Sequence, residues 1–477
     1  MELSTTFLLI SLYVVIEVAG IVTAIFSVLW ARTSQGAAAW AVALITVPVF
    51  ALPAFAIFGG RRFQGYVSKR KHSDTELGKE WKQFEKFFAK VRSFKKGENQ
   101  TYDAFEALAG TPFTKAKSVK LLKDGEEFYP SLKAEIEKAQ TFIDFQFYVF
   151  RDDEIGLEIA DALMEKAQSG VKVRVLYDKI GSQQTKKAFF KKLKAAGVEV
   201  APFISTRWLS HFGNQINFRN HRKLVNIDNH VLFVGGMNVG DDYLSKYPAI
   251  GDWRDTQLLI HGTPAVQAQH SFMADWFWST REVVDFEAKG VPTEGEIPVL
   301  VLATSPVGIK ESGSLAILNA IQAAEQRIWI TTPYFVPDEQ IVSALQLAVL
   351  RGVEVKILLA HKTDARLCDL ASETFFDELI PCGVKIFKYP NGLMHQKVLL
   401  VDEDLSYVGS TNFDNRSFRL NFEIGAWVVE EKFAREVEKM LRTDFAKSTA
   451  VKMEDLKGMP FSQKVKGGFA RLLAPAL

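Results

Sequence analysis

The chain has 477 residues, enough for two or three domains, and 48% of them are apolar. The 58 basic and 56 acidic residues leave a net charge of +2, which argues against a protein that holds nucleic acid by bulk charge alone. Two cysteines, Cys368 and Cys382, cannot form a disulfide framework, and the eight histidines lack the i, i+4 pairing of a metal-binding helix. The composition therefore disfavours a disulfide-stapled secreted domain and a structural zinc protein.

Two apolar runs open the chain. The run from Thr5 to Trp30 is interrupted by Glu17, and the run from Ala37 to Phe58 contains no charged residue. Because an apolar run of about 20 residues spans a bilayer as a helix, the two runs predict a transmembrane hairpin. A cleaved signal peptide is the alternative. It needs basic residues before the apolar run, and here the only charged residue before the run is Glu2.

Basic residues indicate the orientation of this hairpin. The loop between the runs carries only Arg32. The basic residues that follow the second run are Arg61, Arg62, Lys69, Arg70 and Lys71. Because basic residues stay on the cytoplasmic side, the large domain is expected in the cytoplasm. Glu17 lies mid-span, where an ionisable group is costly; it is either functional or paired within the hairpin or a dimer, and we favour pairing.

A third segment, Trp81 to Phe94, has aromatic residues at helical spacing with basic residues between them. It fits an aromatic-faced helix on an anionic membrane surface. An amphipathic helix that faces the protein core fits the same pattern. The sequence leaves both interpretations open.

The rest of the chain contains one α/β unit written twice. The first copy reads strand, helix, strand over residues 142–150, 155–167 and 171–177. The second copy repeats this order over residues 328–335, 339–349 and 353–360. Such units indicate an α/β fold with a largely parallel or mixed sheet, and a duplicated domain can place one site between its copies. The boundary is expected within the Gly/Pro-containing stretch 289–298.

The same motif stands at matching points of the two copies, and both follow the pattern H-x-K-x4-D-x6-G-[GS]-x-N. The first copy supplies His221, Lys223, Asp228 and Asn238. The second copy supplies His395, Lys397, Asp402 and Asn412. We expect His and Lys to project from one face of a strand because they are two residues apart.

Two imidazoles, two ammonium groups and two amides that converge on one place suit a phosphodiester. Lysine and asparagine can hold the non-bridging oxygens and stabilise charge on a five-coordinate phosphorus without a metal. One neutral histidine can attack phosphorus to give a phosphohistidine. The other histidine can donate a proton to the leaving alcohol and later accept one from the incoming alcohol.

The paired motifs resemble those of the phospholipase D superfamily, and within it the chain resembles the bacterial cardiolipin synthases of phospholipase D type. The resemblance covers nearly the whole chain, including the N-terminal hairpin and the apolar-basic C-terminus. It is carried by the strings NFRNHRKLVNID, VGGMNVGDDY, DWRDT, TPYFVPD and GSTNFDNRSFRLNFE. One departure is Gln257, where the family commonly has His, and it puts one local contact in doubt.

The resemblance implies a transphosphatidylation between two phosphatidylglycerol molecules that yields cardiolipin and glycerol. Carried over residue by residue, the catalytic candidates are His221, Lys223, Asp228, His395, Lys397 and Asp402. Asn238 and Asn412 are the candidates for binding the phosphate. The near-symmetric pair of histidines leaves the identity of the nucleophile open.

Four acids have two different expected roles. Asp228 and Asp402 end their strands, where we favour a structural role over a chemical one. Asp255 and Glu423 occupy similar positions downstream of the two motifs and are better candidates to orient the imidazoles. A buried acid beside an imidazole fixes its tautomer.

The expected architecture is an α/β fold of two tandem phospholipase D-like domains, each a mixed sheet flanked by helices, which form a pseudo-twofold pair after the transmembrane hairpin. The expected segments are a hairpin over 1–60, a basic and aromatic linker over 61–108, and domains over 109–290 and 291–477. The expected partners are phosphatidylglycerol and membrane phospholipids, with no nucleic acid, metal or other cofactor. The expected location is a bacterial inner membrane, multi-pass, with the catalytic domain in the cytoplasm.

Other functions use related features. A membrane-bound phospholipase D-type hydrolase differs only in letting water reach the intermediate. A nuclease of the same superfamily would use the same residues without a hairpin and with a stronger basic field. A catalytically dead membrane scaffold is the alternative from another class, and the complete motifs in both copies argue against it.

Overall fold

The computed structural model describes residues 2–30, 34–59, 77–204, 218–246, 251–286, 290–291, 293–307, 310–390, 392–474 and 477. It divides into two compact units, one of Met1–Lys69 with Ile204–Phe218 and one of Arg70–Phe203 with Arg219–Leu477. The basic residues that carry the orientation prediction, Arg32 and those from Arg61 to Lys71, lie outside the described residues. The same holds for part of the predicted linker and of the predicted boundary at 289–298, so the domain limits stay predictions.

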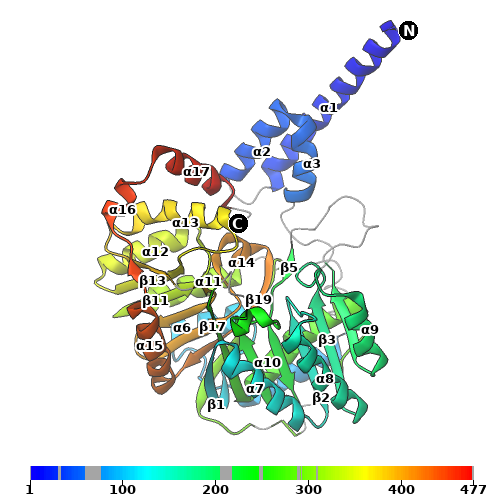
Figure 1. Cartoon of the computed structure of the whole chain (residues 1–477), viewed down its shortest axis with the longest axis vertical. Coiled ribbons are helices and arrows are strands. Elements are labelled where there is room, and N and C mark those ends of the chain that lie inside the picture. Colours follow the sequence, from blue (N-terminus) through cyan, green and yellow to red (C-terminus); the bar gives the residue numbers. More distant parts are fainter. Residues whose placement is uncertain are drawn as a thin grey trace. The chain divides into compact units, whose positions relative to one another are not determined.

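The N-terminal unit contains three apolar helices, α1 (Glu2–Trp30), α2 (Ser34–Thr46) and α3 (Pro48–Phe58) (Figure 1). Within the described residues, one stretch is a helix long and apolar enough to cross a membrane, Thr6–Leu29, with a mean hydropathy of 2.4. The second apolar run is divided at Val47, because Pro48 has no N–H to continue the helix. The predicted second span is therefore two shorter helices.

These helices pack closely against one another. A Cβ atom on Gly20 of α1 would lie 2.4 Å from the carbonyl oxygen of Leu44 in α2, so only glycine allows this approach. Ala24, Leu44 and Ala51 form a small buried cluster between the helices. Glu17 accepts a hydrogen bond from Tyr13 one turn earlier, which gives the mid-span carboxyl group a partner within its own helix.

The aromatic segment that the sequence left open is helix α5 (Gly78–Val91), and its aromatic face is buried in the second unit. The Phe84 ring stacks on Phe286 with 3.9 Å between ring centroids, and Trp81 lies 4.3 Å from the His270 ring. This packing supports the core-facing interpretation and leaves the aromatic face no room to insert into a membrane. Helix α6 (Gln100–Ala109) follows it.

The second unit contains the predicted duplication. The first copy consists of β1 (Thr114–Lys123), α7 (Asp124–Lys138), β2 (Phe142–Phe147), α8 (Glu154–Gln168), β3 (Lys172–Asp178), α9 (Lys187–Ala195), β4 (Glu199–Phe203), β5 (Arg219–Asn220), β6 (Leu224–Ile227), β7 (Val231–Gly235), η1 (Asp241–Leu244), β8 (Trp253–Arg254), β9 (Thr256–Gly262) and α10 (Pro264–Thr280). The second copy consists of β10 (Ile297–Thr304), α11 (Ser312–Ala323), β11 (Arg327–Thr332), β12 (Phe335–Val336), α12 (Glu339–Leu350), β13 (Glu354–Ala360), α13 (Arg366–Leu379), β14 (Lys385–Tyr389), β15 (Leu393–Met394), β16 (Val398–Val401), β17 (Leu405–Gly409), β18 (Phe413–Asp414), α14 (Asn415–Arg419), β19 (Asn421–Val429) and α15 (Glu431–Ala446), followed by β20 (Thr449–Ala450), α16 (Met453–Lys457) and α17 (Phe461–Leu472).

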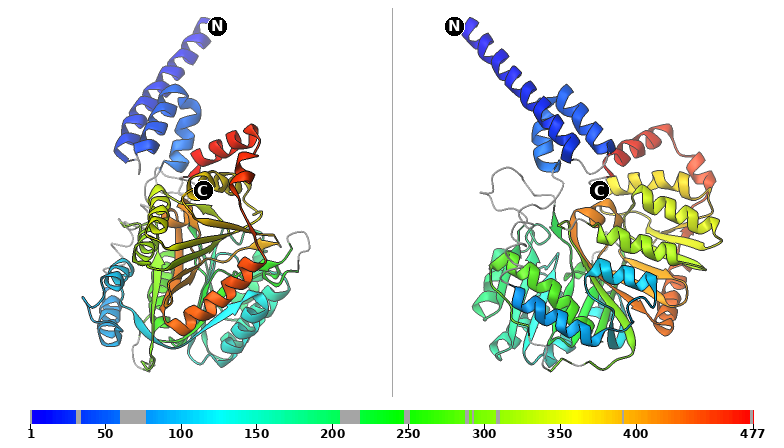
Figure 2. Two further views of the ribbon diagram at one scale, coloured as in Figure 1. Left: turned by 90° about the vertical axis from the view of Figure 1, so that its left-hand side faces the viewer. Right: turned by 180° about the vertical axis from the view of Figure 1, so that it is seen from behind.

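The strand order is the same in both copies and confirms a mixed sheet. It reads β4-β3-β2-β6-β7-β9-β1 in the first copy and β14-β13-β11-β16-β17-β19-β10 in the second. In each copy the first three strands are parallel and the others antiparallel. The copies join through antiparallel pairing of β1 with β10, and helices pack against the sheet (Figure 2). The two copies therefore share one sheet.

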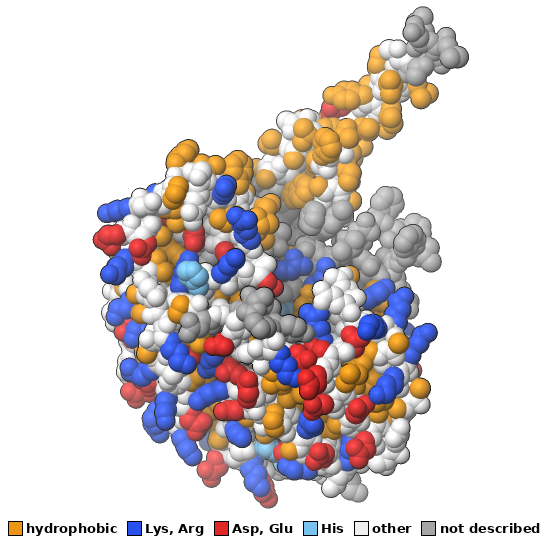
Figure 3. Space-filling model, in the orientation of Figure 1, with side chains coloured by type: hydrophobic (Ala, Val, Ile, Leu, Met, Phe, Trp, Pro, Cys, Tyr) orange, Lys and Arg blue, Asp and Glu red, His pale blue; other side chains and the backbone are white. Residues whose placement is uncertain are grey.

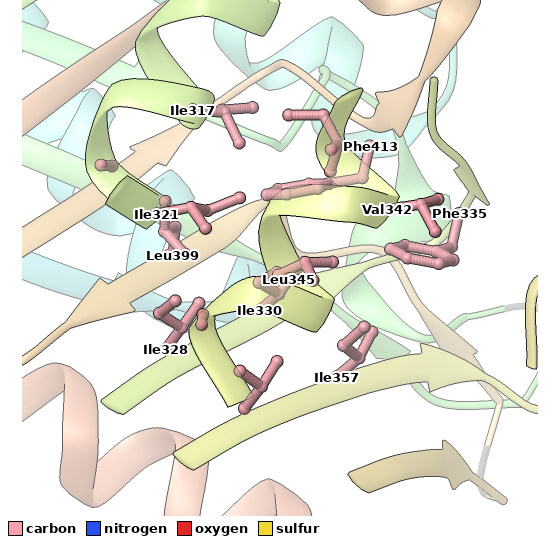
Figure 4. Packing of buried hydrophobic residues seen from close by; sticks show 14 of the residues in the cluster. Ile317, Ile321, Ile328, Ile330, Phe335, Val342, Leu345, Ile357, Leu399 and Phe413 are labelled. Carbon is pink, nitrogen blue, oxygen red and sulfur yellow. The ribbon is translucent and has the colours of Figure 1, made fainter. Parts of the chain in front are cut away.

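Local sequence signals explain why helices α8 and α12 begin and end at matching places in the two copies. Asp153 and Asp338 cap the N-termini of α8 and α12 by accepting from backbone N–H groups. Gly170 and Gly352 follow these helices with φ near +90°, a conformation that glycine adopts without strain. Apolar faces of α11 and α12 then pack on the central strands of the second copy (Figure 4).

Candidate active site

Both motif histidines lie where the chain changes its pairing partner. His221 stands between β5 and β6, and its backbone N–H donates to the carbonyl of Phe422 in β19 at 2.9 Å. His395 stands between β15 and β16, and its N–H donates to the carbonyl of Arg254 in β8 at 2.8 Å. The prediction that a strand carries His and Lys was therefore wrong by a few residues, because the ladder to each copy's own sheet begins only after the lysine.

Each imidazole is held by an acid from the opposite copy. His221 of the first copy has its Nδ1 2.9 Å from Oε2 of Glu423 in the second copy. His395 of the second copy has its Nδ1 2.6 Å from Oδ2 of Asp255 in the first copy. Because the carboxylate engages Nδ1, the tautomer is set and Nε2 is left for chemistry. This crossed pairing makes one site from the two copies.

The two acids are supported differently. Glu423 also accepts from the hydroxyl of Ser410 at 2.5 Å and from the amide of Asn421 at 2.9 Å. Asp255 accepts from the N–H of Thr256 at 2.7 Å. Ser410 and Gly236 occupy the same motif position, and a Cβ on Gly236 would lie 2.1 Å from Oδ1 of Asp255. The [GS] position therefore contacts the acid in both copies.

The two motif lysines are fully buried cations at the same place. Each Nζ donates to the carbonyl of the preceding histidine, at 2.7 Å for Lys223. Burial lowers the pKa of Lys223 to about 7 and that of Lys397 to about 8, with Glu423 and Asp255 opposing the shift. Removal from water makes the ammonium form costly, so an anion bound beside the lysines would restore it.

The other ionisable groups show how closely the two motifs meet. Burial lowers the pKa of His221, against the opposing effect of Glu423, and holds the pKa of His395 well below its usual value, helped by both lysines and by His221. Burial raises the pKa of Asp255 to about 6. Burial also acts to raise the pKa of Glu423, but the His221 charge and hydrogen bond outweigh it and the pKa is lowered. The structure therefore brings the two histidines, the two lysines and the two orienting acids into one electrostatic site.

The two motif asparagines are buried beside this site. The Asn238 amide donates to the Tyr243 hydroxyl at 2.6 Å and accepts from the Val149 N–H at 3.1 Å. Oδ1 of Asn412 is buried without a hydrogen-bond partner among the described residues. Asn238 thus has a structural contact as well, and phosphate binding by the two amides stays a prediction.

Asp228 and Asp402 lie at the far ends of β6 and β16 from the lysines, about 16 Å along each strand at 3.3 Å per residue. Asp228 accepts from the backbone N–H groups of residues 140, 141 and 142, and Asp402 accepts from those of residues 325, 326 and 327. Both have φ near +50°, which turns the chain after the strand. These contacts support the structural role, and we leave both acids out of the proposed catalytic set.

Gln257 occupies the position where the sequence departs from the family pattern. Its side chain is buried, and its Oε1 accepts from the backbone N–H of Met237 at 3.2 Å. Met237 belongs to the Gly-Gly-Met-Asn end of the first motif. The glutamine amide therefore makes a contact of its own with the first motif.

Aromatic residues that the sequence analysis did not select line the histidines. The Tyr148 ring lies 5.0 Å from the His221 ring, and its centroid is 5.4 Å from Nζ of Lys223. The Trp253 and Tyr243 rings lie 5.3 Å and 6.0 Å from the His395 ring. Tyr148 lies within the predicted strand 142–150 and Trp253 lies within DWRDT, so their positions in these segments were the available signal.

Two buried arginines also escaped the sequence analysis. Arg222, between His221 and Lys223, contacts Asp275 of its own copy at 2.6 Å and the carbonyl of Glu423 in the other copy at 3.2 Å. Arg254 contacts Asp124 of its own copy and Asp444 of the other copy, each at 3.0 Å. Both guanidinium groups fasten the two copies together next to the histidines.

Phe335, Asp338 and His270, which lie outside the two motifs, make structural contacts. Phe335 is buried in the core of the second copy, and Asp338 caps α12, whereas the Tyr334 hydroxyl donates to Asp364. His270 packs on Trp81, and His72 and His211 lie outside the described residues. The part of the chain that the structure describes contains no group of three His, Cys, Asp or Glu placed to hold a metal ion.

Comparisons with known proteins agree with this architecture. A family model described as "Cardiolipin synthase, PLD-like domain" matches residues 132–276 and 317–445. Cardiolipin synthase A of Pseudomonas putida (strain GB-1) is 39% identical over 97% of each chain, and cardiolipin synthase A of Pseudomonas fluorescens (strain SBW25) is 39% identical over 96% of each chain. The crystal structure of phosphatidylserine synthase from Haemophilus influenzae Rd KW20 has the same fold, with a TM-score of 0.61 and 18% identity over 80% of this chain and all of that one. The chain belongs to the cardiolipin synthase family of phospholipase D-like phosphatidyltransferases, membrane enzymes that act on phospholipids.

Proposed function

We propose that this chain transfers a phosphatidyl group from one phosphatidylglycerol to a second and produces cardiolipin and glycerol. The crossed pairs His221–Glu423 and His395–Asp255, with Lys223 and Lys397 beside them, carry this proposal. They place two imidazoles of set tautomer and two buried cations in one site. Membership of the cardiolipin synthase family supports the choice of product.

The proposed reaction has two displacements at one phosphorus atom. In the first, Nε2 of one histidine forms a P–N bond while the bond from phosphorus to the head-group glycerol breaks, and the other histidine gives that oxygen its proton. In the second, a hydroxyl of another phosphatidylglycerol gives its proton to this histidine and attacks phosphorus, and the P–N bond breaks. Lys223, Lys397, Asn238 and Asn412 hold the non-bridging oxygens.

Water must be kept from the intermediate for this reaction to succeed. Water at about 55 M outcompetes a dissolved alcohol unless the site is closed and the acceptor is positioned beforehand. The aromatic rings of Tyr148, Trp253 and Tyr243 around the histidines provide an apolar wall for this purpose. An anchor in the bilayer concentrates lipid acceptors next to the site.

We further propose that the N-terminal helices make a multi-pass anchor in a bacterial inner membrane, with the catalytic unit in the cytoplasm. The apolar helix α1 and the packing of α2 and α3 against it support a hairpin. The basic residues that follow the second apolar run support the orientation.

The product of the purified protein tests the proposed reaction. Full-length protein in phosphatidylglycerol vesicles, with a chelator of divalent cations present, should release cardiolipin and glycerol in equal amounts, because the lysines supply the charge stabilisation. His221→Ala and His395→Ala should each release neither product, since one imidazole cannot act as both nucleophile and acid. Release of mainly phosphatidic acid would show a hydrolase, and activity restored only by a divalent ion would contradict the metal-independent chemistry.

A further inference from the structure

Helix α17 (Phe461–Leu472) leaves its apolar face exposed, unlike a typical helix of a soluble domain. Such a helix normally buries its apolar face. Here large apolar side chains point away from the protein, with Phe461, Phe469 and Leu472 exposed by 82%, 67% and 74%. Figure 3 shows apolar side chains gathered over this helix.

The opposite side of α17 is fastened to α13 by small and polar residues. A Cβ on Gly467 would lie 3.2 Å from the carbonyl oxygen of Leu370, so the helices approach closely there. Gln463 donates to Glu373 at 3.0 Å, and Arg471 pairs with Glu378 at 2.5 Å. These contacts hold the helix in the orientation that leaves its apolar side uncovered.

The exposed side chains form one continuous face. Residues spaced by about 3.6 per turn share a face of a helix. The apolar face of α17 consists of Phe461, Val465, Phe469, Leu472 and the following Leu473. The exposed lysines Lys464 and Lys466 lie on either side of this face, and residues 459–477 contain no Asp or Glu.

We propose that the apolar face of α17 inserts into the surface of an anionic bilayer as a second membrane contact of the catalytic unit, additional to the N-terminal helices. Aromatic and aliphatic side chains flanked by lysines, without an acidic residue, match the chemistry of a negatively charged lipid interface. Helix α13 belongs to the second copy, which contains His395. The small and polar contacts between α17 and α13 therefore connect the docked helix to that copy. The proposal does not depend on which reaction the site catalyses.

Site-specific fluorescence on the full-length protein tests the docking. Phe469→Cys is placed in a chain with Cys368→Ala and Cys382→Ala and is labelled with an environment-sensitive fluorophore. Leu157→Cys is the matched control, because Leu157 is an exposed leucine on α8 with Glu154 and Glu158 as neighbours one turn or less away. Both proteins are reconstituted into phosphatidylcholine vesicles with and without phosphatidylserine, and part of the lipid carries a quencher in its acyl chain.

The expected result is quenching at position 469 in vesicles that contain phosphatidylserine, and little quenching at position 157. Lys464→Gln and Lys466→Gln should each lower the ratio of docked to undocked helix about fivefold, since each basic residue is attracted to an anionic surface. Phe469→Glu combined with Leu472→Glu should lose activity on vesicles several-fold and keep it in detergent micelles, which also shows that the variant folds.

Three results would overturn the proposal. The first is equal quenching at positions 469 and 157. The second is equal quenching at position 469 in neutral and anionic vesicles, which would remove the role of the lysines. The third is a shift of the emission at position 469 that grows with protein density without quenching by lipid, which would show that a second copy of the chain covers this face.

Discussion

At the scale of single residues, the two copies use different side chains to position the acid that contacts each histidine. The second copy uses the longer acid, Glu423, and fixes it with the hydroxyl of Ser410. The first copy uses the shorter acid, Asp255, whose carboxylate occupies the space that a Cβ on Gly236 would take. In both copies the acid reaches the Nδ1 of its histidine.

This difference predicts unequal effects of two alanine substitutions. Gly236→Ala should lower kcat by about 10²-fold, because its Cβ displaces the Asp255 carboxylate that orients His395. Ser410→Ala should lower kcat by only about tenfold, because it removes one hydrogen bond to Glu423 and adds no clash. Steady-state kinetics in detergent micelles measure both, with circular dichroism as the control for folding. Equal effects would show that the [GS] position does not act through the acids.

The buried lysines predict how activity depends on pH. Burial lowers the pKa of Lys223 to about 7 and that of Lys397 to about 8, so both are charged below pH 7 and lose their charge as the pH rises through 7 to 8. The value of kcat/KM, which reports the free enzyme, should therefore fall across this range. Burial also lowers the pKa values of both histidines, which favours the neutral form that attacks phosphorus.

Lys223→Arg is the control for this profile, since a guanidinium stays charged throughout. Its alkaline limb should move to higher pH, whatever its absolute rate. A wild-type profile that stays flat up to pH 10 would contradict the assignment of the limb to the lysines.

At the scale of elements, the short strands β5 and β15 place the chemistry. β5 pairs with β19, and β15 pairs with β8. The strand that leads into each motif therefore pairs with the other copy, and the strand that follows the motif lysine pairs within its own copy. Arg254 reinforces one crossing with a buried ion pair to Asp444, and Arg222 reinforces the other by donating to the carbonyl of Glu423. The site therefore depends on the contact between the copies as much as on either fold.

This arrangement predicts that Arg254 holds the copies together. Arg254→Ala leaves Asp444 buried without its cation and should lower the free energy of unfolding by about 3–5 kcal/mol. Arg254→Met combined with Asp444→Leu removes both charges and should be more stable than Arg254→Ala alone. Denaturation of the protein in detergent, followed by tryptophan fluorescence, measures the three proteins. A double variant as unstable as Arg254→Ala would show that the packing of Arg254 matters more than its charge.

At the scale of the whole molecule, the residues proposed for catalysis all lie in one compact unit of the chain. It contains both histidines, both acids and both lysines, whereas the N-terminal helices belong to the other unit. The chemistry and the membrane anchor are therefore separable in principle. The anchor would raise the rate of encounter with lipid rather than take part in catalysis.

A chain that begins near Lys71 tests this separation. It should make cardiolipin and glycerol from phosphatidylglycerol in detergent micelles at a rate similar to that of the full chain. On intact vesicles it should be at least about tenfold slower, because the lipid is no longer concentrated beside the site. Product analysis by mass spectrometry follows both substrates. Loss of activity in micelles would show that the N-terminal helices are needed for catalysis itself.

The sequence by itself determined the duplication, the mixed α/β fold, the family and the candidate groups of the site. These depend on hydrophobic periodicity and on motif spacing, which are local properties of the chain. The apolar composition of the N-terminal runs was equally readable, although the break at Val47 divided the second run into two helices.

Only the tertiary structure decided which acid holds which histidine. Asp255 and Glu423 stood at equivalent places, but the sequence could not show that each crosses to the other copy, because strand exchange joins residues far apart in the chain. Only the tertiary structure likewise revealed the aromatic rings around the histidines, the contacts of Arg222 and Arg254 with the other copy, and the burial of the aromatic face of α5. These contacts also join residues far apart in the chain. The outward apolar face of α17 also emerged only from the structure, because periodicity shows that a helix has two faces and the packing partner decides which one is covered.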